Sequence, residues 1–222
     1  MSAESPLRDG IAPGFTLIET LRWEPETGFM RLKRHLARLA ASATTLGLRH
    51  DPVAARAALE GTIEGAAGPQ RVRLTLAADG AVEVTTQPFQ PLPDSTAWIL
   101  RLARTRLSSQ DALLRHKTSR RYAYLAARAE YTTADADEVL LANERGEICE
   151  GTITNLFVDT GDGGPLLTPA LMCGLLPGIL RGEFLDQGRA REAVLTLDDL
   201  IDAKQLYVGN SLRGLIAAKL GR

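Results

Sequence analysis

The sequence predicts an α+β protein with two domains. Runs rich in β-branched and aromatic residues, such as FTLIETLRW at residues 15–23, predict strands. The segment RHLARLAASATTL at residues 34–46 repeats its apolar residues with the spacing of a helix. Near residues 103 to 110 the polar stretch TRLSSQD marks a boundary. We therefore expect a small N-terminal domain over residues 1–106 and a larger C-terminal domain over residues 107–222.

The composition narrows the range of partners. The 222 residues carry a net charge of −1, which argues against a nucleic-acid or anionic-membrane partner held through bulk charge. No apolar run is long enough to span a bilayer. The first residues, MSAESPLRDG, lack the basic and apolar regions of a signal peptide. We expect a cytoplasmic protein in which residues 1–13 form a loose tail.

Cysteines and histidines are few. Cys149 and Cys173 occur in no metal-binding or redox spacing, which predicts two free thiols in a reducing compartment. His35, His50 and His116 are scattered along the chain. We therefore expect no metal site.

The N-terminal half predicts strands and helices in a regular order. After the strand at residues 15–23, PETG predicts a turn into a strand at residues 29–32. The helix at residues 34–46 is expected to end at Gly47. Pro52 suits the first turn of a second helix at residues 51–66. A hairpin over residues 71–87 turns at Ala78-Asp79-Gly80, and a further strand follows at residues 98–103.

Arg71 and Arg73 alternate with Val72 and Leu74 in the first strand of this hairpin. Both arginines therefore project to the same face. They could bind a substrate carboxylate there, although a solvent-facing sheet edge explains them as well.

Lys117 precedes a segment with helical periodicity. Tyr122, Leu125, Ala126 and Ala129 recur at the spacing of one helix face, and Thr118 or Ser119 could cap that helix. Lys117 thus lies on the loop that leads into a helix. A lysine beside a histidine is commonly a solvated surface charge.

Glu150 lies among strands. The segment DEVLLANERGEICEGTITNLFVD predicts strands at residues 138–141, 147–150 and 153–158, with a turn at residues 143–146. The apolar and β-branched neighbours of Glu150 should draw its carboxylate into the interior, where it needs a cationic partner. That partner could be a nearby arginine, or the protonated ring nitrogen of a pyridoxal phosphate whose aldehyde is held by Lys117 as a Schiff base.

The C-terminal segment continues with short elements. A glycine-rich turn at residues 160–164 precedes a strand at Leu166-Leu167. Pro177 suits the first turn of a helix whose apolar side contains Ile179, Leu180, Phe184 and Leu185. A strand at residues 192–197, a helix at residues 198–203 and a strand at residues 206–209 follow, the last ending in Asn210-Ser211.

Three motifs carry a family resemblance. HKTSRRYAY, DEVLLANERGEICEGTITNLF and LLTPALMCGLLPGILR resemble, in this order, the class IV, fold-type IV pyridoxal-phosphate family. Its members include branched-chain and D-amino-acid aminotransferases and aminodeoxychorismate lyase. The resemblance runs from about Phe15 to the C-terminus. It implies a small N-terminal α+β domain, a larger C-terminal domain, pyridoxal 5′-phosphate in the cleft between them, and a homodimer.

The resemblance also implies roles for individual residues. Lys117 would form the Schiff base and move the substrate α-proton, and Glu150 would keep the ring nitrogen protonated. Arg38, in HLARL, would reach the cofactor phosphate. Arg73 or Arg71 would bind the substrate. Further phosphate and ring contacts are implied for Gly178, Ile179, Leu180, Asn210, Ser211 and Tyr122, with Tyr124 as a second candidate for the ring hydroxyl.

Each of these roles has an ordinary structural alternative. Arg38 could be a helix-surface arginine, Gly178 a plain helix start and Asn210-Ser211 a plain strand-to-helix turn, while either tyrosine could simply pack in the core.

The motifs and the short N-terminus look most like aminodeoxychorismate lyase, an enzyme of folate biosynthesis that releases pyruvate and forms 4-aminobenzoate. A branched-chain or D-amino-acid aminotransferase acting on a small amino substrate is the first alternative. A non-catalytic protein of the same fold is the second, suggested by the missing N-terminal strands.

Overall fold

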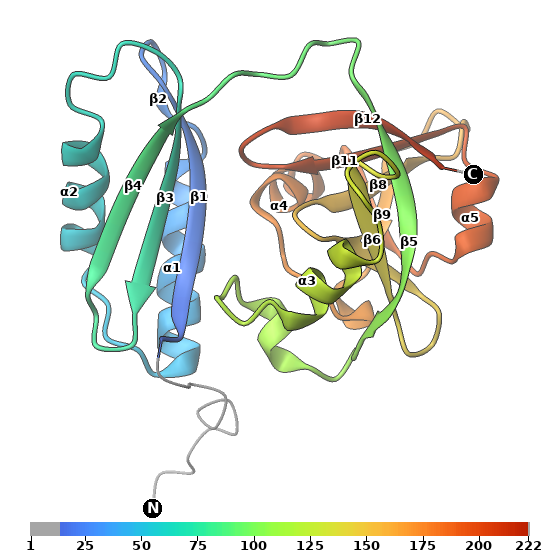
Figure 1. Cartoon of the computed structure of the whole chain (residues 1–222), viewed down its shortest axis with the longest axis horizontal. Helices are drawn as coiled ribbons and strands as arrows, with labels where there is room; N and C mark the ends of the chain where they lie inside the picture. Colours follow the sequence, from blue (N-terminus) through green and yellow to red (C-terminus); the bar gives the residue numbers. More distant parts are fainter. Residues whose placement is uncertain (1–13, 222) are drawn as a thin grey trace, which may run out of the picture. The chain divides into compact units, whose positions relative to one another are not determined.

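A computed structural model describes residues 14–221, so the predicted tail at residues 1–13 lies outside the described residues (Figure 1). The chain has a mixed α+β fold, as predicted, and divides into two compact units. Unit 1 contains the chain up to Pro91 together with His116–Arg120. Unit 2 contains Leu92–Arg115 and the chain from Arg121 onward. Within residues 14–221 no helix is long and apolar enough to cross a membrane.

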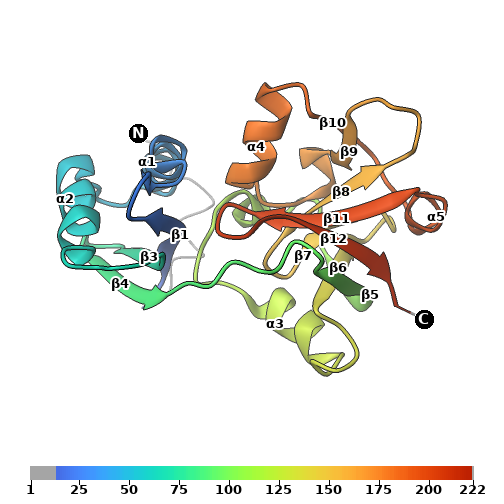
Figure 2. The same ribbon diagram turned by 90° about the horizontal axis from the view of Figure 1, so that it is seen from above.

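Unit 1 is an antiparallel sheet with two helices on one face (Figure 2). The strand order is β2-β1-β3-β4. The strands are β1 (Thr16–Glu24), β2 (Gly28–Phe29), β3 (Gln70–Ala77) and β4 (Val82–Pro88), and the helices are α1 (Leu32–Leu46) and α2 (Pro52–Thr62). Alternate apolar residues of β1 and β3, such as Leu21 and its partner Val72, are buried, which gives the sheet one apolar face for the helices.

Local signals set the ends of both helices. Gly47 ends α1 with a φ of 68°, a left-handed conformation that suits glycine. Asp51 caps α2 by accepting hydrogen bonds from the amides of Val53 and Ala54. The helix stops at Thr62, earlier than the predicted residue 66, in a stretch where Gly61 and Gly65 weaken helix formation.

Unit 2 is built on an eight-stranded mixed sheet of order β10-β9-β8-β11-β12-β5-β6-β7. The strands are β5 (Ala97–Leu107), β6 (Glu138–Asn143), β7 (Ile148–Gly151), β8 (Asn155–Asp159), β9 (Leu166–Pro169), β10 (Ala190–Ala193), β11 (Gln205–Asn210) and β12 (Gly214–Leu220). The helices are α3 (Tyr122–Ala129), α4 (Ile179–Asp186) and α5 (Leu197–Ile201), with short 3-10 turns at Ala112–Arg115 and Leu171–Cys173. β6 and β7 are buried throughout their length.

The strand β5 belongs to the sheet of unit 2. A division after residue 106 would place almost all of it in the N-terminal domain, whereas its backbone pairs in parallel with β6 and β12. Conversely, His116–Arg120 belongs to unit 1 although it follows β5, because this segment pairs with β1.

The buried face of α3 differs from the prediction. Tyr122 and Leu125 are 80% and 64% exposed, and Ala126 and Ala129 are exposed too. Tyr124 and Ala127 face inward instead, because they pack with apolar residues of β5 and β6. The predicted caps were also wrong: Arg121 occupies the N-cap position and no side chain caps the helix.

Three short predicted elements also differ. The strand expected at residues 29–32 is reduced to β2, because α1 already begins at Leu32. The strand expected at residues 192–197 is shifted to β10, because Thr196 caps α5 through a reciprocal pair of hydrogen bonds with Asp199. The turn after Asn210 leads into β12, so it connects two strands of a hairpin and no helix follows it.

Candidate functional site

Glu150 lies in β7, next to its last residue Gly151, with its carboxylate buried, as predicted, and only 4% of the residue is exposed. One carboxylate oxygen accepts hydrogen bonds from the Tyr124 hydroxyl at 2.7 Å and from the Leu176 amide at 3.0 Å. The other accepts one from the side-chain amide of Asn155 at 3.3 Å. These three donors are uncharged, and they orient the carboxylate.

Tyr124 reaches Glu150 from α3. Burial, followed by the negative charge of Glu150, raises the pKa of Tyr124 well above its usual value, so its hydroxyl remains a donor. The Arg121 guanidinium lies over the Tyr124 ring, 4.5 Å from its centroid. Arg121 also donates to the carbonyl of Thr152. The phenol is therefore held between a cation and a carboxylate.

The turn that follows Glu150 is fixed by a second buried carboxylate, that of Glu138. Glu138 accepts hydrogen bonds from the amides of Thr152 and Ile153 and from the hydroxyls of Thr152 and Thr154. A Cβ atom on Gly151 would lie 2.7 Å from this carboxylate, so only glycine fits there. Glu138 was not among the predicted site residues, because its donors on this turn are distant from it in the sequence and no neighbouring residue indicates them.

The start of α4 lies beside Glu150. Gly178 is its N-cap, and no side chain caps the first turn. A Cβ atom on Gly178 would lie 1.8 Å from Oδ1 of Asn155, so this approach requires glycine. Asn155 joins the two features, since its amide donates both to Glu150 and to the carbonyl of Leu176. A helix start with amides free of side-chain caps attracts phosphate.

Asn210 is the last residue of β11, and Ser211 follows it. Oδ1 of Asn210 accepts from the amides of Leu212 and Arg213, and its Nδ2 donates to the carbonyl of Ile153. Asn210 therefore holds the β11–β12 turn against the turn that follows Glu150. Ser211 is buried, with 7% exposed. Gly209 lies close to Leu180 of α4, because a Cβ atom there would be 2.9 Å from that side chain.

Lys117 lies in unit 1 and is half-buried. Its carbonyl accepts a hydrogen bond from the Ile18 amide at 2.8 Å, and the Ser119 amide donates to the carbonyl of Thr16 at 2.9 Å. His116, which precedes it, is 2.9 Å from the Ser42 hydroxyl of α1, and burial lowers the pKa of His116. The lysine backbone is thus fixed by β1.

Arg38 binds Glu19 through two hydrogen bonds, from Nε at 2.8 Å and Nη2 at 2.6 Å. His35 Nδ1 lies 2.6 Å from the same carboxylate. Burial acts to raise the pKa of Glu19, but the charge of Arg38 and the hydrogen bonds from His35 and Arg38 outweigh burial and hold that pKa at about 2. Burial lowers the pKa of His35. Arg38 is 12% exposed at its side chain, which does not fit an ordinary surface arginine.

The two arginines of β3 are half-buried on the sheet face opposite the helices. Arg71 donates to the side chain of Gln87 at 3.3 Å, and Arg73 pairs in register with Thr20. The predicted residues therefore form two groups. Unit 2 brings together Glu150, the start of α4, and Asn210-Ser211; unit 1 holds Lys117, Arg38, Arg71 and Arg73.

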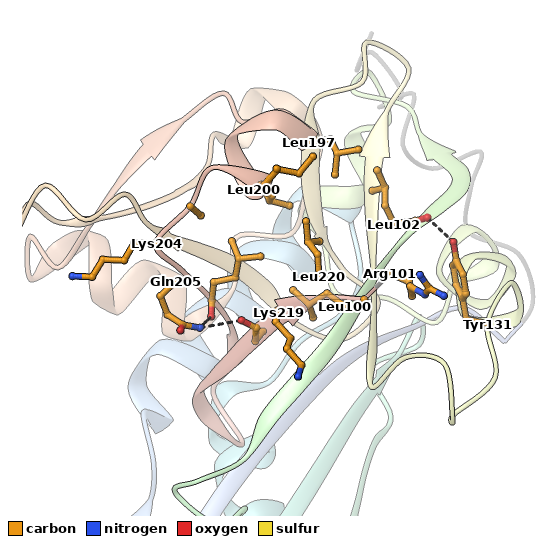
Figure 3. A pocket seen from close by; sticks show the side chains of 15 residues that line it. Leu100, Arg101, Leu102, Tyr131, Leu197, Leu200, Lys204, Gln205, Lys219 and Leu220 are labelled. Atoms are coloured by element: carbon orange, nitrogen blue, oxygen red, sulfur yellow. Dashed lines mark hydrogen bonds between the residues drawn. The ribbon is translucent and has the colours of Figure 1, made fainter.

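A separate hollow of about 630 Å³ lies in unit 2 between α5 and strands β5, β11 and β12 (Figure 3). Leucines such as Leu100 and Leu200 form its floor, and the amines of Lys204 and Lys219 point away from them (Figure 3). None of the predicted site residues lines this hollow, and its lining contains no carboxylate, thiol or imidazole. Nor do residues 14–221 contain a group of three side chains suited to a metal ion.

Comparisons with known proteins identify the family. Residues 16–220 match the sequence profile of the family described as amino-transferase class IV. A structure provisionally named an amino-acid aminotransferase, from Mesorhizobium loti, is 61% identical with a TM-score of 0.91, covering 93% of this chain and 99% of that one. A provisionally named aminodeoxychorismate lyase of Schizosaccharomyces pombe is 29% identical over 89% of this chain and 86% of its own length.

The residues of the site suit the cofactor of this family, pyridoxal 5′-phosphate. The pyridoxal-phosphate-bound form of a protein described as a hypothetical aminotransferase, from Mycobacterium tuberculosis, shares the fold, with a TM-score of 0.82 at 19% identity over 99% of this chain and 86% of that one. In this chain a buried carboxylate could face a protonated ring nitrogen, and an uncapped helix start could hold a phosphate. The protein is an enzyme of the class IV aminotransferase family, with the fold-type IV architecture and pyridoxal 5′-phosphate as its cofactor.

Proposed function

We propose that this enzyme is an aminodeoxychorismate lyase, which eliminates pyruvate from 4-amino-4-deoxychorismate to give 4-aminobenzoate. The observation that carries the proposal is the pair of tyrosines on α3. In the aminotransferase branch a tyrosine five residues after the lysine bonds the ring hydroxyl. In lyases that position varies. Here that residue, Tyr122, is 80% exposed, whereas Tyr124 is buried against Glu150. The name of the S. pombe relative supports the same activity.

The charge of the proposed substrate also suits unit 1. Pyruvate and 4-aminobenzoate each carry one carboxylate, so the substrate carries two. Arg71 and Arg73 place two guanidinium groups on one face of β3. Guanidinium groups bind carboxylates through paired donors. We propose that these two residues bind the substrate carboxylates.

The lysine is the proposed proton carrier. When bound, pyridoxal phosphate supplies an electron sink for negative charge at the substrate α-carbon. Lys117 would hold the cofactor covalently, and its amine, once displaced by the amine of the substrate, would remove the α-proton and later return a proton. The backbone hydrogen bond from Ile18 limits the positions that this amine can reach.

The other proposed residues act by orientation and charge. Glu150 would keep a proton on the ring nitrogen. The amides at the start of α4, near Gly178, Ile179 and Leu180, would bind the phosphate together with Ser211 and Arg38.

A second candidate function is transamination. The M. loti relative, at 61% identity, is provisionally named an aminotransferase. Both reactions begin with removal of a proton from the carbon that carries the substrate amine. The experiment that separates them follows pyruvate released from 4-amino-4-deoxychorismate when no 2-oxo acid acceptor is present. Release of pyruvate and 4-aminobenzoate in equal amounts supports the lyase. A strict requirement for an acceptor, with branched-chain or D-amino acids as donors, would support the aminotransferase.

We also propose that the enzyme is a homodimer and that it acts in the cytoplasm. The exposed stripe on α3, formed by Tyr122, Leu125, Ala126 and Ala129, is an apolar surface that a second copy could cover. The two buried free cysteines, Cys149 and Cys173, are typical of a reducing compartment. Light scattering should give the mass of a dimer for the wild type and that of a monomer for Leu125→Glu. A monomeric wild type at micromolar concentration would contradict the dimer.

A further inference from the structure

We infer that Tyr124 is a positioning residue that acts through Glu150. Its hydroxyl holds the Glu150 carboxylate in place and makes it a weaker base, so that the proton between this carboxylate and the ring nitrogen of pyridoxal phosphate stays on the nitrogen. The inference rests on the proposed role of Glu150. The Tyr124 hydroxyl donates to Glu150 at 2.7 Å, so this role differs from a hydrogen bond to the ring hydroxyl of the cofactor.

The surroundings of Tyr124 fix the direction of this hydrogen bond. The residue is 9% exposed and packs with Ala103, Leu141 and Cys149, so the ring has little freedom to turn. Arg121 lies over one face of the ring. Because burial and the charge of Glu150 raise the pKa of Tyr124, the phenol keeps its proton and the hydroxyl can donate to the carboxylate.

The carboxylate is the acceptor for several donors at once. Oε1 accepts from Tyr124 and Leu176, and Oε2 accepts from Asn155. Each hydrogen bond to the charged form stabilises that form and lowers the proton affinity of the carboxylate. A carboxylate of low proton affinity leaves a shared proton on its partner. The Tyr124 hydroxyl therefore favours a protonated ring nitrogen, which is the form that accepts electrons from the substrate.

Two variants separate this role from general packing. Tyr124→Phe removes the hydroxyl and keeps the ring. Tyr131→Phe is the matched control, because its hydroxyl also donates one hydrogen bond, to the neutral carbonyl of Leu102 at 2.9 Å. Thermal unfolding of both variants with bound cofactor checks that the fold is retained.

The direct readout is the nitrogen-15 chemical shift of pyridoxal phosphate labelled at the ring nitrogen and bound to each protein. We expect the shift of a protonated nitrogen in the wild type and in Tyr131→Phe, and a displacement toward the neutral form in Tyr124→Phe. The value of kcat should fall about tenfold in Tyr124→Phe, as expected for losing a hydrogen bond to a charged group, with KM nearly unchanged.

An analogue without the ring nitrogen tests whether Tyr124 acts through that atom. With the carbon analogue of pyridoxal phosphate, in which a C–H group replaces the nitrogen, the wild type and Tyr124→Phe should have the same kcat. A wild-type nitrogen shift in Tyr124→Phe, or an equal loss of kcat with both cofactors, would overturn the inference while leaving the proposed function intact. An unprotonated ring nitrogen in the wild type would overturn the role of Glu150 as well.

Discussion

The Ile18 amide donates a hydrogen bond to the carbonyl of Lys117 at 2.8 Å, so a strand near the start of the described chain fixes the backbone of the proposed catalytic lysine. The neighbouring residues repeat this contact, since Leu17 and Thr118 are bridge partners and the Thr16 amide donates to the Ser119 hydroxyl. Contacts between residues that are far apart in the sequence recur in the site.

Glu138→Gln should destabilise unit 2. The carboxylate accepts from three amides and two hydroxyls, and a side-chain amide would turn one of its acceptor atoms into a donor that faces other donors. Each buried group left unsatisfied costs about 1–3 kcal/mol, so the free energy of unfolding in urea should fall by at least that amount. The control is Glu144→Gln, an exposed carboxylate that accepts from the Ser109 amide and hydroxyl. Equal effects of the two changes would contradict the role given to Glu138.

Gly178→Ala should disturb Glu150 and the start of α4 together. The new methyl group would lie 1.8 Å from Oδ1 of Asn155 and would displace that side chain from Glu150. Overpacking of this kind costs about 1–3 kcal/mol, and we expect weaker binding of pyridoxal phosphate in a fluorescence titration.

Gly61→Ala is the matched control, since a Cβ atom there meets nothing within 4 Å. This helical position should gain about 0.5–1 kcal/mol from alanine. Unchanged cofactor affinity in Gly178→Ala would show that this glycine is dispensable for the site.

The stability of unit 1 should depend on pH through Glu19. Its pKa of about 2 in the folded protein lies below the ordinary value of 4.5. A group with a lowered pKa stabilises the fold above the unfolded value, and the contribution is lost as pH falls from 4.5 to 2. The difference corresponds to about 3 kcal/mol. His35, whose pKa is also lowered, adds a loss in the same direction below pH 6.5.

Urea unfolding at several pH values tests this dependence. Glu19→Gln should be less stable than the wild type at pH 6 and should lose less stability on acidification. Glu60→Gln, which changes an exposed pair with Arg56, should keep the acid dependence of the wild type. If the stability of Glu19→Gln depended on pH as that of the wild type does, the role given to Glu19 would be contradicted.

Local patterns in the sequence predicted most elements. Residues that favour strands predicted β1, the turn at Ala78-Asp79-Gly80 predicted the β3–β4 hairpin, and Gly47 and Pro52 marked helix ends that the structure confirms. The burial of Glu150 also followed from its neighbours. These features depend on residues that are close in sequence, which is why periodicity and cap signals suffice for them.

Features that depend on distant contacts were not predictable in this way. The apolar stripe that contains Tyr122 and Leu125 indicated the packed face of α3, yet the inward face is the one with Tyr124, because β5 and β6 supply its partners. Glu138 gave no local signal of its four donors on the turn after β7. The pairing of Lys117 with β1 depends on the segment His116–Arg120, which belongs to unit 1 although the residues on both sides of it belong to unit 2.

The most direct test of the central claim is reduction of the enzyme, loaded with pyridoxal phosphate, by borohydride, followed by digestion and mass spectrometry. The chain has four lysines, Lys33, Lys117, Lys204 and Lys219, so the attachment point can be assigned without ambiguity. We predict that the reduced cofactor is found on Lys117 and that Lys117→Ala carries none. Labelling of another lysine in the wild type, or of none, would contradict the account.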